Sequence, residues 1–400
     1  MEKYMKFILV LMCVFFCIGQ NIHASAFAPS DFTELKHRAD SLKSNKSFNE
    51  ALQLYDSLCI MVPNDVDILI SKGICQSQIG AINESLEIFK KVKEIDSTSP
   101  LLWKSIGDAY LFANLPQSAI TSYVRSILLN PNYSQAFSSL GAAYQRMNMK
   151  DTAELAFKKA LEIDSMNHEA WYNWSLLLNS NGSVDQAMRC LKRSIAVKQD
   201  FAPAFNNLGM LYYGAGFADS ALAAFNAAII LEKSNSFYYN NAGLACLDLR
   251  DTLQAYNFFK SALRYDSMNV KALFNTGLTS YYLLQYKDGI EYIMKALQLQ
   301  PNVAEYWYTV GLIHAAKNEP HIASGYWIRC MKLDSSNSKY SFAIGSLYND
   351  SSSVKREYYT IAASLGNEKA KSWLETHPVI KETIPIDEVP KQKKQKKKKR

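Results

Sequence analysis

The sequence predicts an all-α fold, a solenoid built from stacked helical hairpins. Three observations predict it. A period of 34 residues runs through most of the chain, each period carries apolar residues at helical spacing, and Asn, Asp, Ser and Pro cluster between periods as helix caps and turns. The composition, with 48% hydrophobic and 20% charged residues among 400, is that of a globular protein.

A column of small residues sets the register of the period. A Gly inside a helix costs about 1 kcal/mol relative to Ala, so its recurrence predicts the close approach of another helix. One hairpin cannot bury its apolar face alone, and stability is therefore expected to come from stacking. The column consists of Gly73, Gly107, Gly141, Ser175, Gly209, Gly243, Gly277 and Gly311.

Three further columns keep the same step. Bulky residues stand four positions before the Gly, small residues twelve after it, and large apolar residues sixteen after it. We expect the small columns to let the two helices of a pair approach, and the aromatic columns to fill the spaces between pairs. The last column is Phe89, Tyr123, Phe157, Leu191, Phe225, Phe259, Ile293 and Trp327.

The columns divide the chain into nine repeats without insertion. We expect a partial repeat at 338–376 to cap the end of the solenoid, because the 34-residue phase is lost there. The predicted repeats are 32–65, 66–99, 100–133, 134–167, 168–201, 202–235, 236–269, 270–303 and 304–337.

The columns resemble the tetratricopeptide repeat (TPR), most clearly in "AFSSLGAAYQRMNMKDTAELAFKKALEID", Ala136 to Asp164. The closing Pro of the family pattern is present at Pro63, Pro131 and Pro301 and is replaced elsewhere. The resemblance implies a right-handed superhelix whose first helices line a concave surface. The segment "AASLGNEKAKSWL" in the cap resembles the related Sel1-type repeat.

A polar column lies two residues before the Gly, on the first helix of each repeat. The array of O-linked N-acetylglucosamine transferase carries a similar row of amides that holds an extended peptide by its backbone, and the resemblance implies the same role for Asn173, Asn207, Asn241 and Asn275 only. An amide can pair with both C=O and N–H of an extended residue. A polar, solvated surface without a ligand is the alternative. The candidate groove residues are Ser139, Asn173, Asn207, Asn241, Asn275 and Thr309.

The first 26 residues read as a secretory signal peptide. Lys3 and Lys6 precede an apolar run from Phe7 to Gly19, and the small residues Ala24 to Ala26 follow it. We therefore expect export to the periplasm or cell envelope. The alternative is an uncleaved signal anchor that tethers the protein to the membrane.

Basic residues crowd the end of the predicted disordered tail, 377–400. Without them the chain, formally +7, would be nearly neutral, so a nucleic-acid partner is not expected. Anionic lipid or a cell-envelope polymer is a candidate partner of this segment, and a merely solubilising tail is the alternative. The residues are Lys391, Lys393, Lys394, Lys396, Lys397, Lys398, Lys399 and Arg400.

The sequence offers no catalytic motif. It contains no phosphate-binding glycine loop, no G-x-S-x-G and no H-E-x-x-H, and the cysteines after the signal are scattered. We expect no catalytic residue, metal or cofactor. The expected function is a non-enzymatic module that binds a protein or an extended peptide in its concave groove. The alternative is a structural scaffold of an envelope assembly or export machine that docks folded partners through its flanks.

Overall fold

The computed structural model describes residues 29–378, and this part of the chain consists of 21 α-helices without a β-strand. The predicted all-α class is confirmed. The signal segment 1–26 and the basic residues of the tail lie outside the described residues. Within residues 29–378, no helix has the length and apolar character needed to span a bilayer.

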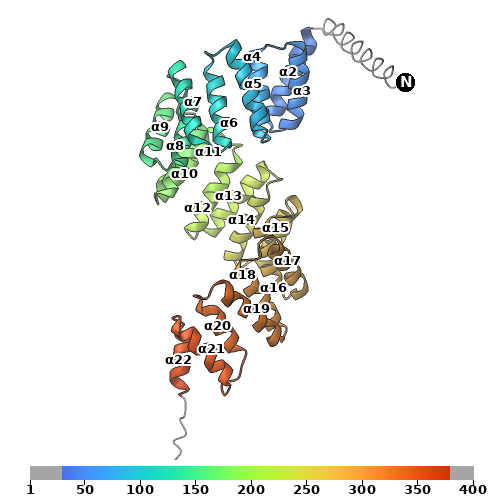
Figure 1. Cartoon of the computed structure of the whole chain (residues 1–400), viewed down its shortest axis with the longest axis vertical. Coiled ribbons are helices and arrows are strands. Elements are labelled where there is room, and N and C mark those ends of the chain that lie inside the picture. Colours follow the sequence, from blue (N-terminus) through green and yellow to red (C-terminus); the bar gives the residue numbers. More distant parts are fainter. Residues whose placement is uncertain (1–28, 379–400) are drawn as a thin grey trace, which may run out of the picture. The chain divides into compact units, whose positions relative to one another are not determined.

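The described residues divide into two compact units, one that ends at Lys233 and one that begins at Ser234. In the first unit, each helix packs against the next along the chain, and the hairpins stack beside one another (Figure 1). Its helices are α2 (Pro29–Ser44), α3 (Phe48–Met61), α4 (Val66–Gln78), α5 (Ile82–Ile95), α6 (Pro100–Phe112), α7 (Pro116–Leu129), α8 (Ser134–Arg146), α9 (Lys150–Ile163), α10 (His168–Ser180), α11 (Val184–Val197), α12 (Ala202–Gly214) and α13 (Ala218–Leu231).

The second unit continues the same hairpin pattern and ends in three shorter helices. The last three, α20 to α22, occupy the segment expected to form the cap. The helices of this unit are α14 (Ser236–Asp248), α15 (Thr252–Tyr265), α16 (Val270–Tyr282), α17 (Tyr286–Leu299), α18 (Ala304–Ala316), α19 (Pro320–Leu333), α20 (Ser338–Ser346), α21 (Ser353–Ser364) and α22 (Glu368–Thr376).

The glycine column exists because an aromatic ring occupies the place of a side chain. A Cβ added to Gly141 would lie 2.6 Å from Cε1 of Phe157, which comes from the second helix of the same hairpin. The same arrangement recurs at Gly209, where an added Cβ would lie 2.6 Å from Cε1 of Phe225. Real Cβ atoms do not approach carbon this closely, so the ring and the missing side chain are coupled requirements.

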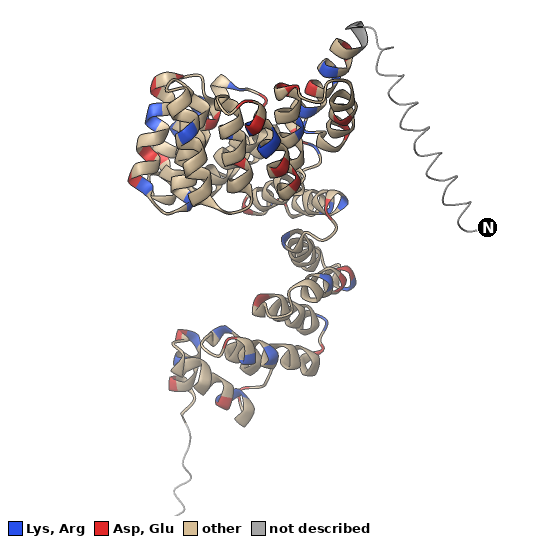
Figure 2. Cartoon of the chain, turned by 45° about the horizontal axis from the view of Figure 1, so that its top comes forward, with Lys and Arg blue, Asp and Glu red and all other residues tan. Residues whose placement is uncertain are grey.

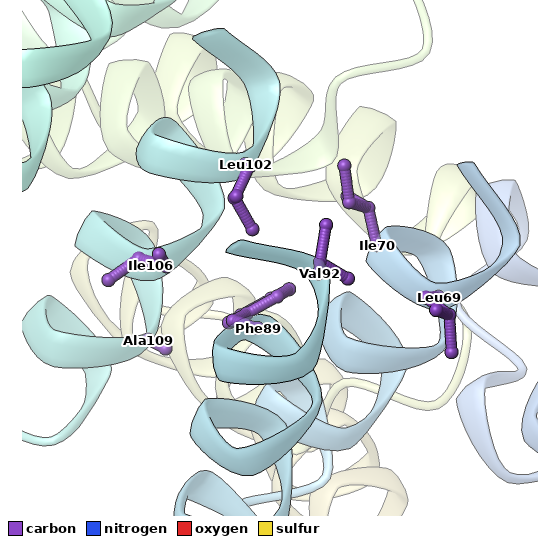
Figure 3. Close-up of a cluster of buried hydrophobic side chains, with 7 residues drawn as sticks. All are labelled: Leu69, Ile70, Phe89, Val92, Leu102, Ile106 and Ala109. Atoms are coloured by element: carbon purple, nitrogen blue, oxygen red, sulfur yellow. The ribbon is translucent and has the colours of Figure 1, made fainter. Parts of the chain in front are cut away.

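The large apolar column therefore does more than fill the spaces between pairs. Phe89 packs inside its own hairpin against Gly73, and it also belongs to a buried cluster that reaches the next hairpin (Figure 3). These residues were expected to fill the spaces between pairs, and they also pack within their own hairpin. The cluster comprises Leu69 and Ile70 of α4, Phe89 and Val92 of α5, and Leu102, Ile106 and Ala109 of α6.

Buried asparagines join some repeats where a first helix begins. Asn167 caps α10 by accepting a hydrogen bond from the backbone N–H of Ala170 at 3.0 Å, and its amide donates to the Ser134 hydroxyl at 2.7 Å. Asn269 repeats this arrangement in the second unit with Ala272 and Ser236. Each amide thus satisfies a helix end and ties it to the preceding repeat.

Candidate binding groove

First helices form the inner side of the stack in each unit. α4 approaches α6, α6 approaches α8, and α8 approaches α10, while α14, α16 and α18 do the same in the second unit. Neighbouring second helices do not approach one another in this way within residues 29–378. Hairpins that curve are closest on the inside of the curve, so we call the exposed face of the first helices the inner wall.

The candidate groove residues lie on six first helices. In the first unit Ser139, Asn173 and Asn207 stand on α8, α10 and α12, and each is half-buried. In the second unit Asn241 and Asn275 stand on α14 and α16 and are also half-buried.

We call the side chains of Asn173, Asn207, Asn241 and Asn275 the ladder amides. Those of the first unit, Asn173 and Asn207, contact the preceding first helix. The amide of Asn207 donates to the hydroxyl of Tyr172 at 3.0 Å, and that of Asn173 makes a longer contact of 3.5 Å with the hydroxyl of Ser138. In both cases the acceptor stands 35 residues earlier in the sequence. The amide column therefore stabilises the stack itself.

The second unit shows the same bond. The amide of Asn275 donates to Oδ1 of Asn240 at 2.9 Å, again 35 residues earlier. This acceptor column is hard to recognise in the sequence because its residues differ chemically, with Ser138, Tyr172 and Asn240 in equivalent places. Recurrence of a polar residue three positions before the Gly was the signal available. An Asn that uses one N–H in this way has a second N–H for another partner, and a carbonyl oxygen that can accept two hydrogen bonds; that of Asn207 accepts one from the amide of Asn206 at 3.4 Å.

Thr309 departs from the pattern. Its side chain is 1% exposed, and its hydroxyl donates to the backbone carbonyl of Glu305 at 2.9 Å within α18. Thr309 therefore cannot contact a ligand on the inner wall, and the proposed groove does not include it. At the other end of the row, Ser139 lies close to the phenolic oxygen of Tyr123.

A second polar feature, which joins the two helices of a hairpin, was not anticipated. Two repeats carry Tyr where the others carry Phe, Leu, Ile or Trp, and only these two place Asp immediately after the small residue of the Gly column. The hydroxyl of Tyr55 donates to Asp40 at 2.6 Å, and that of Tyr123 donates to Asp108 at 2.8 Å. The pairing follows from burial, because a phenol hydroxyl in the core needs an acceptor.

Charges near these pairs are compensated. The amine of Lys104 lies 2.8 Å from Asp108, and that of Lys43 lies 3.1 Å from Asp40. Burial opposes the charge of Lys104, but the attraction of Asp108 outweighs it and raises the pKa of the amine. Acidic and basic residues are interspersed along the helices of both units (Figure 2).

The titratable groups suit a structural role. Burial raises the pKa of Cys75, Cys190 and Cys246 to about 11 and that of Cys330 to about 12, so these thiols stay protonated at neutral pH. Within residues 29–378, no three His, Cys, Asp or Glu side chains gather as a metal site would require.

Comparison with known proteins identifies the repeat. Residues 134–165 match the family model of the tetratricopeptide repeat. The chain is similar in structure to the Cut9–Hcn1 hetero-tetramer of the APC/C, with a TM-score of 0.51 and 12% identity over 87% of this chain and 76% of the other. The chain has the fold of a TPR solenoid. The TPR fold is typical of protein–protein interaction, and the predicted TPR solenoid is confirmed.

Smaller solved structures match parts of this TPR chain. Pseudomonas aeruginosa PilF matches with a TM-score of 0.47 and 20% identity, covering 52% of this chain and 94% of PilF. YrrB, a TPR protein with an unusual peptide-binding site, matches with a TM-score of 0.36 and 20% identity, covering 46% of this chain and 95% of YrrB. No curated protein matches the sequence.

Proposed function

We propose that this TPR protein is a non-catalytic module of the cell envelope that binds a protein or an extended peptide along its inner wall. The observation that carries the proposal is that each unit carries half-buried amides on neighbouring first helices: Asn173 and Asn207 in one unit, Asn241 and Asn275 in the other. The envelope location rests on the signal-like sequence of residues 1–26 alone.

The amides support recognition of a backbone in preference to a particular sequence. A peptide backbone offers alternating donors and acceptors, and an Asn side chain can pair with both. Each such bond contributes about 0.5–1.5 kcal/mol net, so several in a row sum to useful affinity without any one being decisive. The bonds to the preceding first helix assist, because an amide already held in place loses less freedom when a ligand arrives.

Alanine substitution of the amides tests the proposal. The four-residue variant N173A/N207A/N241A/N275A should lose a partner that co-purifies with the wild-type protein from native envelopes. A matched control replaces exposed second-helix residues, for example Thr121→Ala and Gln186→Ala. Circular dichroism must show equal helical content in both variants. Undiminished capture by a folded amide variant would contradict groove binding.

A second candidate function is a scaffold that docks folded partners through its flanks, and one observation in the second unit favours it. The guanidinium of Arg329 lies 4.1 Å from the centre of the Trp307 ring, which stacks on Tyr326 at 5.8 Å. Trp, Tyr and Arg are the residues most enriched at binding hot spots. Arg329→Ala together with Tyr326→Ala should abolish capture under the scaffold function and leave it intact under groove binding.

The basic segment Lys391 to Arg400 is proposed to add affinity for an anionic lipid or envelope polymer. A cluster of Lys and Arg near an anionic surface gains about 1 kcal/mol per charge, and salt screens the attraction. Binding to vesicles containing anionic lipid should fall when the chain is truncated after Pro390 and should weaken with added salt. Equal binding of the truncated chain would contradict this role.

A further inference from the structure

One repeat of the first unit breaks the pairing of Gly with a large side chain. In the repeat 168–201 the small-residue column carries Ser175 and the apolar column carries Leu191. The two departures belong together. A ring at position 191 would meet the Ser175 side chain, since an added Cβ already lies 2.6 Å from the ring atom at Gly141 and at Gly209 in the flanking repeats.

The shorter Leu191 leaves a cavity of about 70 Å³ between α10 and α12. Ser175 and Leu191 are its buried residues together with Leu211, and Leu176, Asn179, Asn207 and Met210 complete its lining. Asn179 is exposed and Met210 is 43% exposed, so the mouth opens on the inner wall. The cavity is thus reached from the proposed groove, beside one of its ladder amides.

The size and lining of the cavity select its occupant. A cavity of about 150 Å³ lined by Leu, Ile and Phe takes up benzene, so about half that volume suits a small branched aliphatic group and excludes an aromatic ring. All lining residues are uncharged, and a charged side chain placed there would lose its hydration without a counter-ion. Asn207 at the rim is placed to hold the backbone that carries the inserted side chain.

We propose that this cavity is a specificity pocket, which accepts one small branched aliphatic side chain, such as Val, from a segment bound along the inner wall of the first unit. The proposal rests on the proposed groove binding and adds a sequence preference to it. The amides alone would grip any extended backbone, whereas the pocket would fix the register of the bound segment at α10 and α12.

The flanking repeats show which substitutions would test the pocket. S175G/L191F rebuilds the Gly and Phe pair of the flanking repeats, which fills the cavity and leaves Asn173 and Asn207 unchanged. S175G alone enlarges the cavity. The probe is a display library of fully randomised linear peptides, selected on the wild-type chain and on both variants. Peptides selected on the wild type are then measured with their aliphatic anchor replaced by Ala.

We expect the wild type to enrich peptides with a Val-like residue at one position, and Ala there to weaken binding by about tenfold or more, as one to two lost methyl groups do in an apolar pocket. S175G/L191F should still select peptides, without that preference, and S175G should shift the preference towards Leu or Ile. Two results would overturn the pocket while leaving groove binding intact. The enriched peptides could show no preferred residue at any position, or both variants could show the same preferred residue as the wild type. Failure to enrich any peptide would overturn both.

Xenon provides a readout that needs no peptide. Xenon enters small apolar cavities, so it should shift the methyl resonances of Met210 and Leu211 in the wild type and leave them unmoved in S175G/L191F. Equal shifts in the two proteins would overturn the assignment of the cavity. The S175G chain serves the same purpose should the double variant fail to fold, since its larger cavity must give larger shifts.

Discussion

Asn275 and Asn240 are joined across neighbouring first helices by a hydrogen bond of 2.9 Å from the amide nitrogen of the first to Oδ1 of the second. Asn240 is 4% exposed, so its carbonyl oxygen depends on this donor. The amide column therefore has a structural role in addition to the binding role proposed for it. Experiments must distinguish the effect of an amide substitution on stability from its effect on binding.

The first prediction concerns this bond. Asn275→Ala should lower the free energy of unfolding by about 1–3 kcal/mol, because it leaves a buried acceptor without a partner. Urea denaturation measures the change. Lys271→Ala, at an exposed position of the same helix, is the matched control and should fall within about 0.5 kcal/mol of the wild type. A stability of N275A equal to that of the control would show that the bond contributes nothing.

Two glycines of α12 give a second matched test. Gly209→Ala should destabilise the protein by about 1–3 kcal/mol, since the new Cβ overlaps the ring of Phe225. At Gly214 an added Cβ meets no atom within 4 Å, so Gly214→Ala should be neutral or stabilise by up to about 1 kcal/mol. Thermal melting compares them. Similar effects of both substitutions would contradict the ring-and-glycine account.

The pair formed by Tyr123 and Asp108 predicts strong coupling. Y123F should cost about 0.5–1.5 kcal/mol, and D108L should cost more because it leaves the buried hydroxyl without an acceptor. Together they recreate the apolar combination of the flanking repeats, so the double variant should be more stable than the sum of the single losses by about 0.5–3 kcal/mol. A double-mutant cycle by denaturant unfolding tests this, and simple additivity would refute it.

The buried phenols predict loss of stability in alkali. Burial and the bond to Asp40 raise the pKa of Tyr55 above its ordinary value of 10.0, and burial and the charge of Asp108 do the same for Tyr123. The folded state thus holds these protons more tightly than the unfolded state does. Their contribution to the free energy of unfolding is complete below pH 10 and declines as the pH rises above it.

The measurement is the free energy of unfolding of the wild type and of Y55F/Y123F from pH 8 upward. The variant lacks both protons, and its stability should fall less steeply above pH 10. Parallel curves of the free energy of unfolding against pH would show that other groups cause the loss of stability in alkali.

The sequence predicted the fold well because every hairpin repeats the same packing problem. Gly141 and Phe157 are visible as two columns of one period, and their contact follows once two helices are assigned to each repeat. The break at Ser175 and Leu191 was equally visible. Its consequence was not, because whether a smaller pair collapses or leaves a cavity depends on how far α10 and α12 can close.

The candidate site was only partly predictable. The polar column was evident, but a column does not reveal which of its members turn inward. Thr309 is buried against its own helix, whereas Asn207 bonds Tyr172 and still lies at the rim of a cavity. Hydrogen bonds between residues 35 apart join two different columns, so neither column discloses them by itself.

The central claim is that the inner wall holds an extended segment, and site-specific photo-crosslinking in the intact cell tests it most directly. A benzophenone side chain would replace Asn179 on the inner wall or Thr121 on a second helix, both exposed. The account predicts a discrete crosslinked partner from position 179 that disappears in the N173A/N207A background, and none from position 121. A partner captured only from position 121, or captured from position 179 regardless of the amides, would contradict it.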